Sequence, residues 1–459
     1  MIPNYRYIIL LLAPMLLAAQ EKTDLQQILE RLDRLEQENK DLAAEVRSLR
    51  AEIAGSRITS KPEVSAAATP QTEAAPTTPP LDERVTVAEH RIDEQAQEKV
   101  QASQRLPITL TGMVLFNGYL NGRANGGDQN PWIASPTDST QVGGASLSQS
   151  VVGLQFQGPK VIGGGHVNGS VYLDLFGGST SSLNHLVRLR VATISIDWKN
   201  TSVAVGQDKP IIAPREPNSL AQVGVSPLTS AGNLWLWQPQ VRIEQRFSFG
   251  DQAGLRAQLG VYQTSEPSAG DRGAYSTNIS TAARPGLEGR FEFWRQFGEG
   301  KRLEIAPGFH VSTTHVAGVS IPSRLFSLDW LIQPLPKIQF TGAFFHGEND
   351  AGVGGLRQGF TIFESGRVAG IGATGIWSQL SLLATERLSF NLYGGEENDR
   401  ASDLQTGDIH RNLIYAGNAI YRIGPNVLLG LEASQVRTDY LWAPGRLNNH
   451  YDVALGYLF

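Results

Sequence analysis

Eight histidines are the side chains of this sequence best suited to bind a metal ion or to transfer a proton near neutral pH. No two of them have the His-x-x-His or His-Glu-x-x-His spacing that would place two imidazoles on one helix face as zinc ligands. The eight are His90, His166, His185, His310, His315, His346, His410 and His450. This pattern predicts neither a metal site nor a cofactor.

Nucleophilic catalysis has no better support in the sequence. The chain has no cysteine, which excludes a thiol nucleophile, a thiolate-bound zinc, an iron–sulfur cluster and a disulfide. A Gly-x-Ser-x-Gly elbow is absent, and the glycine clusters at 163–165 and 352–355 are typical of turns and loops. We therefore expect that the protein is not an enzyme.

Arginines that alternate with apolar residues are the strongest chemical feature. Guanidinium groups bind carboxylates and phosphates through two parallel hydrogen bonds, whereas lysine acts as a point charge. If Glu244 and Glu292 neutralise Arg242 and Arg290 two residues away, this surface has little selectivity, and if they do not, it favours anions. The candidate charges are Arg188, Arg190, Arg242, Glu244, Arg246, Arg256, Arg290 and Glu292. Of these, Arg190, Arg242 and Arg290 are expected at similar heights.

The segments that carry these arginines alternate with a period of two. In 239–249 the apolar Val241 and Ile243 face one way, while Arg242 and Glu244 face the other. Such charges opposite a continuous apolar face fit a wall with lipid outside and water inside, and a soluble barrel would invert the pattern. The last segment, 449–459, alternates in the same way and ends on the aromatic Phe459.

The alternating segments are numerous enough to close a large barrel. Sixteen strands are expected to start near Ile108, Leu147, Val167, Val187, Thr201, Gln240, Gly254, Leu287, Arg302, Arg324, Lys337, Gly372, Leu388, Asn412, Asn426 and Asn449. Seven short connections alternate with eight longer ones, as antiparallel strands with both termini on one side require. The sequence therefore predicts an all-β fold, with a 16-stranded antiparallel transmembrane β-barrel over residues 106–459.

The residues before the barrel predict four other segments. Residues 1–19 have the basic start, short apolar centre and small terminal residues of a signal peptide. Residues 25–53 repeat every seven as an α-helical coiled coil, 54–80 form a Pro/Ala/Thr-rich linker, and 81–104 form a short helical segment. The coiled-coil core is Leu25, Ile28, Leu32, Leu35, Asn39, Leu42, Val46, Leu49 and Ile53. The heptads leave dimer and trimer open.

Charge and hydropathy limit the partners. The formal charge of −5 over 459 residues lacks the concentrated basic surface that a nucleic acid requires, so no nucleic-acid partner is expected. A mean hydropathy of −0.19 fits either a soluble protein or a barrel, because alternating residues cancel in the average.

The order of signal peptide, coiled coil, Pro-rich linker and Gly-rich barrel ending in Phe459 resembles the trimeric outer-membrane porins. Within them it is most similar to the DcaP-like channels, which carry a periplasmic coiled coil before a sixteen-stranded barrel. The resemblance implies a homotrimer formed through barrel and coiled coil, set in outer-membrane lipid with its N-terminal part in the periplasm. It also implies passive diffusion of small hydrophilic solutes, often anions such as carboxylates.

The resemblance assigns roles to two further sets of residues. In sixteen-stranded porins the third long loop folds into the barrel and narrows the pore. In this sequence the third long loop is 207–238. Its candidate constriction residues are Asp208, Lys209, Arg215, Glu216, Trp235 and Trp237. Tyr457 and Phe459 form the terminal aromatic signal by which such barrels are inserted.

Two other functions stay open. A sugar-selective or a general porin is the closest alternative, because Trp235, Trp237 and Tyr119 provide aromatic faces for stacking, although interface girdles also use Trp and Tyr. A structural anchor, bound to peptidoglycan through the coiled coil, is the alternative of another class. Swelling of liposomes in maltose against succinate separates the transport hypotheses, and a pull-down with isolated peptidoglycan tests the anchor.

Overall fold

The computed structural model describes residues 108–177, 185–262, 280–281, 285–316, 319–356 and 358–459. The chain divides into two units, Met1–Gln95 and Ala96–Phe459, and the described residues belong to the second. The predicted signal peptide, coiled coil, linker and 81–104 helix lie outside the described residues. Over the described part of the chain, no helix has the length and apolar character needed to cross a membrane.

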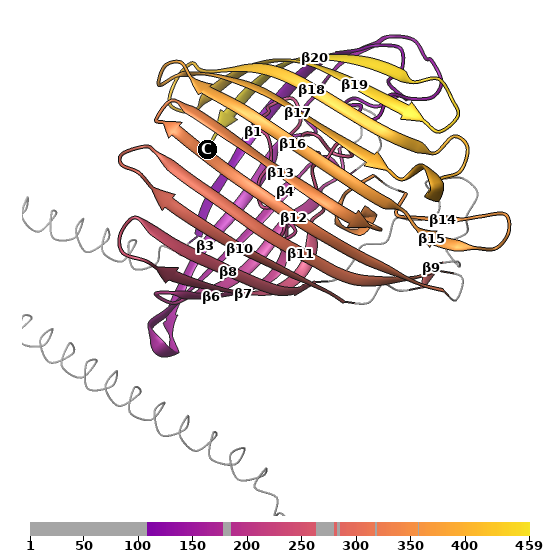
Figure 1. Cartoon of the computed structure of the whole chain (residues 1–459). Helices are drawn as coiled ribbons and strands as arrows, with labels where there is room; N and C mark the ends of the chain where they lie inside the picture. Colours follow the sequence, from indigo (N-terminus) through magenta and orange to yellow (C-terminus); the bar gives the residue numbers. More distant parts are fainter. Residues whose placement is uncertain (1–107, 178–184, 263–279, 282–284, 317–318, 357) are drawn as a thin grey trace, which may run out of the picture. The chain divides into compact units, whose positions relative to one another are not determined.

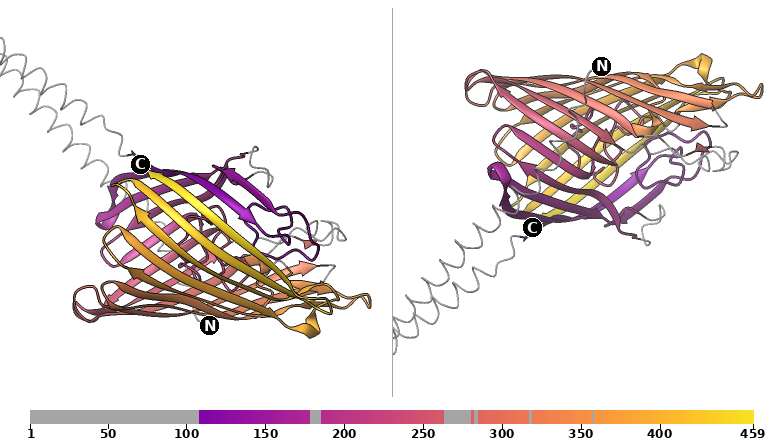
Figure 2. Two further views of the ribbon diagram at one scale, coloured as in Figure 1. Left: turned by 90° about the horizontal axis from the view of Figure 1, so that it is seen from above. Right: turned by 90° about the horizontal axis from the view of Figure 1, so that it is seen from below.

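One sheet contains eighteen strands; β2 and β9 are short additions that pair with β1 and β11, and β1 pairs with both β3 and β20. The other sixteen form a closed antiparallel ring (Figures 1 and 2). The ring consists of β1 (Ile108–Asn121), β3 (Val151–Val161), β4 (Gly165–Asp174), β5 (Arg188–Asp197), β6 (Thr201–Asp208), β7 (Gln238–Ser248), β8 (Ala253–Tyr262), β10 (Gly286–Gln296), β11 (Arg302–Val316), β12 (Val319–Leu335), β13 (Ile338–Glu348), β16 (Gly372–Leu383), β17 (Leu388–Asp399), β18 (Ile409–Arg422), β19 (Val427–Tyr440) and β20 (Arg446–Leu458). The predicted sixteen-stranded barrel is confirmed.

The smaller elements lie at the edge of the ring or in its connections. They are β2 (Val142–Ser146), β9 (Ser280–Thr281), the hairpin of β14 (Phe360–Ile362) with β15 (Val368–Gly370), and the 3-10 turns η1 (Ile162–Gly164), η3 (Ala351–Val353) and η4 (Ala401–Asp403). In η1, Gly163 and Gly164 both have φ of +74°, which explains the glycines between β3 and β4.

Alternation places apolar side chains outside the ring and polar ones inside. On β20, Tyr451, Val453 and Leu455 are about half exposed, while the alternating His450 and Asp452 are buried within the barrel. A closed ring leaves no unpaired sheet edge, so the backbone polar groups are satisfied without water on the outside. The outer face is therefore suited to lipid.

One predicted connection is wrong. We expected a long loop at 313–322, but β11 and β12 continue their pairing as far as Val316 opposite Val319. Thr313, Thr314 and His315 extend the strand because each has a partner across the ladder, and β-branched residues favour extended backbone. Strand pairing overrides the polar composition that resembles a loop.

The inside of the barrel is partly filled by packed loops. The connections at 122–141, 209–237 and 349–371 contribute to two buried apolar clusters against the inner wall. One cluster is Ala124, Ala134, Leu228, Ala231, Trp377, Tyr393, Ile414, Ala416 and Val436, and the other is Ile212, Ala213, Leu234, Tyr262, Leu325, Phe345, Val353 and Ala373. The wall residues of these clusters belong to β8, β12, β13 and β16–β19.

Candidate pore and its constriction

The loop 209–237, between β6 and β7, lies inside the barrel. Its outgoing arm is held by side chains of successive strands. The Ile211 amide donates to Glu288 of β10 at 2.6 Å, and the Asn218 amide donates to Gln379 of β16 at 2.6 Å. Further along, the Asn117 side chain of β1 donates to the Leu220 carbonyl at 2.8 Å. This arm therefore crosses the interior from β10 to β1.

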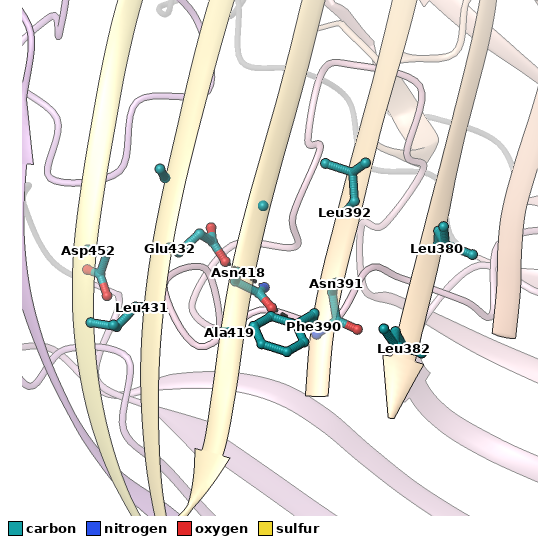
Figure 3. A pocket seen from close by; sticks show the side chains of 12 residues that line it. Leu380, Leu382, Phe390, Asn391, Leu392, Asn418, Ala419, Leu431, Glu432 and Asp452 are labelled. Atoms are coloured by element: carbon teal, nitrogen blue, oxygen red, sulfur yellow. Dashed lines mark hydrogen bonds between the residues drawn. The ribbon is translucent and has the colours of Figure 1, made fainter. Parts of the chain in front are cut away.

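A chain of polar side chains holds the middle of the loop (Figure 3). The amide of Asn391 donates to Asn418 at 2.8 Å, and Asn418 donates to the carboxylate of Glu432 at 3.0 Å. The Ser219 hydroxyl of the loop donates to the same carboxylate at 2.6 Å. Asn418 also donates to the Asn218 carbonyl at 2.7 Å, which fixes the loop from two sides.

The returning arm packs closely on β16. Gly232 has φ of +91°, and a Cβ built there would lie 2.4 Å from the Ile376 carbonyl oxygen. Only glycine has both the conformation and the small size for this approach. Asn412 donates to the Ser230 carbonyl at 2.8 Å, and the Trp235 amide donates to Val353 of the 349–371 loop at 3.2 Å.

Arg215 of the loop enters a buried ion-pair network. Its Nε lies 2.8 Å from Asp329 of β12, and its guanidinium also pairs with Glu304 of β11. Arg290 of β10 bonds to the same Asp329 at 2.6 Å and to Glu292 at 2.8 Å. We expected Arg290 to face water, but its side chain is completely buried, because Glu292 of β10, Asp329 of β12 and the amide of Gln258 of β8 surround it.

Arg188 and Arg190 form a second group, beside the end of the loop. Asp174 of β4 lies 2.6 Å from Arg188 and 3.5 Å from Arg190. Both guanidinium groups stack on Trp237, with 5.1 and 4.8 Å from each central carbon to the ring centre. Arg188 also donates to the Gly224 carbonyl, which connects the loop to β5.

The remaining predicted charges lie on β7, β8 and the start of the loop. Arg242 pairs with Asp208 at 2.9 Å, and Lys209 pairs with Glu216 at 2.6 Å. Although Glu244 is two residues from Arg242, it does not pair with it. Glu244 pairs with Arg246 at 2.6 Å. On β8, Arg256 pairs with Glu292 at 2.8 Å.

The partners in these ion pairs differ in exposure. Asp174, Asp329 and Glu292 have side chains that are 0%, 1% and 4% exposed. Arg246, Arg256 and Arg302 are 47%, 33% and 41% exposed and pair with carboxylates that are 11%, 4% and 7% exposed. Arg242 is 29% exposed, and its partner Asp208 is 23% exposed. On β7, β8 and β11 these guanidinium groups are thus more exposed than their carboxylate partners, whereas at the start of the loop Asp208 and Glu216 are themselves 23% and 36% exposed.

The aromatic candidates occupy different environments. Trp235 is buried and meets Trp237 edge to face, with ring centres 5.3 Å apart. The guanidinium groups of Arg188 and Arg190 stack on the ring of Trp237, so the protein's own side chains occupy its face. Tyr119 lies opposite Gly144 of β2, away from both tryptophans in the strand order.

Sequence reasoning missed the carboxylates that position the arginines. Asp174, Glu304 and Asp329 lie on the inner faces of their strands and alternate with apolar residues on the outer faces. This alternation is the sequence signal that could have identified them as inward-facing. The alternation does not show which of these carboxylates pairs with which arginine, because the partners lie on strands far apart in sequence. Over the described residues, no group of three or more His, Asp or Glu side chains is placed to bind a metal ion.

Tyr457 and Phe459 close the ring at its seam. Tyr457 is half exposed on the outer face of β20, opposite Val114 of β1. Phe459 exchanges two backbone hydrogen bonds with Gly112, at 3.0 and 3.2 Å. A Cβ on Gly112 would meet the Phe459 ring at 2.7 Å, so the ring lies directly on this glycine.

Comparison with solved structures identifies the architecture. The structure is similar to the outer membrane channel DcaP of Acinetobacter baumannii, with a TM-score of 0.63 and 14% identity over 77% of this chain and 97% of that chain. The chain has the porin fold. An anion-selective porin from Comamonas acidovorans matches with a TM-score of 0.53 and 12% identity over 77% of this chain and 99% of the other.

A third porin, OmpF of Salmonella typhi in complex with daunomycin, matches with a TM-score of 0.50 and 11% identity, over 77% of this chain and 97% of that chain. The expected resemblance to DcaP-like porins is thus confirmed at the level of fold. No protein-family model and no curated protein matches the sequence.

Proposed function

We propose that this protein is an outer-membrane porin through which small hydrophilic anions, carboxylates above all, diffuse passively. The orientation of the ion pairs supports this proposal most directly. The side chains of Arg190, Arg242 and Arg246 are 14%, 29% and 47% exposed, and each is more exposed than its carboxylate partner, at 0%, 23% and 11%. An anion in this path meets donors first, and a ring or wall of one charge sign is how such pores select ions.

Assembly and location belong to the same proposal. The protein forms a homotrimer in outer-membrane lipid after removal of residues 1–19, and its coiled coil lies in the periplasm. The likeness of the barrel to porins and the heptads at 25–53 support this arrangement. A structural anchor has less support, because an anchor has no use for arginines that face water.

Reversal potentials in a salt gradient test the selectivity. We expect the parent channel to prefer chloride over potassium, and the double variant Arg190→Gln/Arg242→Gln to shift the potential toward cations. Arg446→Gln is the matched control, because Arg446 pairs with Asp138 at the loop end of β20. A parent channel that prefers cations, or a double variant that behaves like the parent, contradicts the proposal. Liposomes are expected to swell faster in succinate than in maltose.

A further inference from the structure

A belt of uncharged polar side chains crosses the inner faces of β3, β4 and β5. In one row, Gln157 lies opposite Asn168, and Asn168 lies opposite Ser195. In the next row, Gln155 lies opposite Ser170, and Ser170 lies opposite Thr193. The Ser170 and Thr193 hydroxyls are 3.1 Å apart. The belt therefore presents amides and hydroxyls, with the carboxylate of Asp197 at its end on β5.

The rows continue across β6 to Arg242. Ala204 lies opposite both Ser195 and Arg242, and Gly206 is the next inward position on β6. These residues are the smallest available, so no side chain of β6 separates the belt from the guanidinium group. Two strand spacings, about 10 Å, join the backbone of Ser195 to that of Arg242. A small molecule can therefore contact both at once.

Arg242 keeps donors for a ligand. One of its terminal nitrogens, Nη1, pairs with Asp208 at 2.9 Å, and the side chain is 29% exposed. A guanidinium group has five N–H donors, so a single carboxylate partner leaves others for a carboxylate in the pore. This end of the surface takes an acid group.

The belt itself fits hydroxyl groups better than a second carboxylate. Asn168 and Ser195 both donate to Asp197, at 2.7 and 2.8 Å. Their donors are thereby directed to the Asp197 carboxylate, and the Asn168 carbonyl and the Ser195 lone pairs remain as acceptors. A hydroxyl can donate to these acceptors, whereas a carboxylate cannot.

The space in front of the belt has room for such a ligand. A cavity of about 660 Å³ is lined by Gln155, Gln157, Asn168, Ser170, Thr193 and Ser195, together with residues of β1. Sites for small ligands commonly span 300–1,000 Å³. The belt is therefore exposed to a defined space, whose lining ends at β5, so a ligand that also reaches Arg242 extends from this space across Ala204 of β6.

We propose that this surface is a subsite for sugar acids, in which Arg242 binds the carboxylate and the belt binds the hydroxyl groups of the carbon chain. The inference rests on the proposed anion-preferring pore and names the class of anion that this wall favours. A hydroxylated acid binds here more tightly than an acid of the same length and charge without hydroxyl groups.

Block of single-channel current in planar bilayers tests the subsite, with gluconate and hexanoate as probes of equal chain length and charge. For the parent channel we expect gluconate to block at lower concentration than hexanoate. In Ser170→Ala/Ser195→Ala, the half-blocking concentration of gluconate rises roughly three- to tenfold, because two hydrogen bonds are lost, and that of hexanoate stays unchanged. The control Ser381→Ala/Ser389→Ala removes two serines from β16 and β17 and behaves like the parent channel.

The outcomes separate this inference from the proposed function. An anion-selective parent that is blocked equally by both probes overturns the subsite alone, as does a Ser170→Ala/Ser195→Ala channel with unchanged gluconate block. A parent without anion preference overturns the proposed function. Reversal potentials of the belt variant are expected to match those of the parent, which shows that the pore is intact.

Discussion

Arg190 of β5 stacks on Trp237, the last residue of the internal loop, with 4.8 Å between the guanidinium carbon and the ring centre. Arg188 stacks on the same ring at 5.1 Å. The tryptophan thus orients two cations of the pore wall, and it does so from the loop that narrows the barrel. The position of the 209–237 loop and the positions of the Arg188 and Arg190 charges are therefore coupled through the indole of Trp237.

Trp237→Leu is expected to weaken anion preference without removing any charge. Each cation–π contact contributes about 0.5–2 kcal/mol, and its loss lets Arg188 and Arg190 adopt other rotamers. The reversal potential in a salt gradient is expected to move toward zero. Trp237→Phe keeps an aromatic face and retains most of the parent value. Equal potentials for the Leu and Phe variants would show that the indole does not orient the arginines.

Arg290→Gln is expected to affect stability rather than selectivity. The substitution leaves Asp329 and Glu292 buried with one cation fewer, and breaking such a pair costs about 3–5 kcal/mol. Urea unfolding of the refolded barrel measures this loss. Arg437→Gln, at a side chain that is 56% exposed, is the control and is expected to change stability by less than about 1 kcal/mol. Parent-like stability of the Arg290 variant contradicts the network.

Gly232→Ala is expected to displace the returning arm of the internal loop. The new methyl would meet the Ile376 backbone at 2.4 Å, in addition to the strain of a positive φ. Gly127→Ala is a matched control, because Gly127 has φ of +86° and open space around it. We expect altered conductance and more current noise for Gly232→Ala only. Similar traces for both variants would show that the close approach is unimportant.

Much of the barrel could be predicted from the sequence because alternation is a local property. Each of the sixteen expected strand starts lies within five residues of an observed one, from Ile108 at β1 to Asn449 within β20. The pattern succeeds because lipid and water impose opposite demands on the two faces of every strand. It fails at 313–322, where hydrogen bonding between neighbours continues through polar residues.

The candidate site was less predictable. Alternation placed Arg290 on the inner face, and it is there, but sequence spacing cannot show that Asp329 lies beside it from two strands away. The filling of one side of the barrel also has no local signal, since Leu228 and Val353 belong to loops whose contacts are all distant in sequence. A side chain on the inner face of a strand is exposed to water only where no loop covers that part of the barrel wall.

Removal of Phe459, or its replacement by Asp, is expected to lower the amount of folded barrel in the outer membrane. Phe459 supplies both backbone hydrogen bonds to Gly112 at the seam between β20 and β1, and its ring covers that glycine. Deletion removes all of these contacts, whereas Asp retains the backbone pair and places a charge where an aromatic residue anchors the strand. Heat-modifiable band intensity on gels measures the folded fraction. Intensities equal to the parent for both variants refute the role.

Deletion of 25–53 is expected to leave a barrel that inserts but forms trimers more slowly or less stably. Parallel heptads raise the local concentration of three barrels, so their loss makes each encounter between barrels a second- or third-order event. Native gels over a time course of refolding and the temperature of trimer dissociation measure both effects. Asn39→Leu, which replaces the single polar core residue and strengthens the coiled coil, is expected to act in the opposite direction on the dissociation temperature. If the deletion variant assembles at the parent rate and dissociates at the parent temperature, the coiled coil has another role, and binding to isolated peptidoglycan is then the function to test.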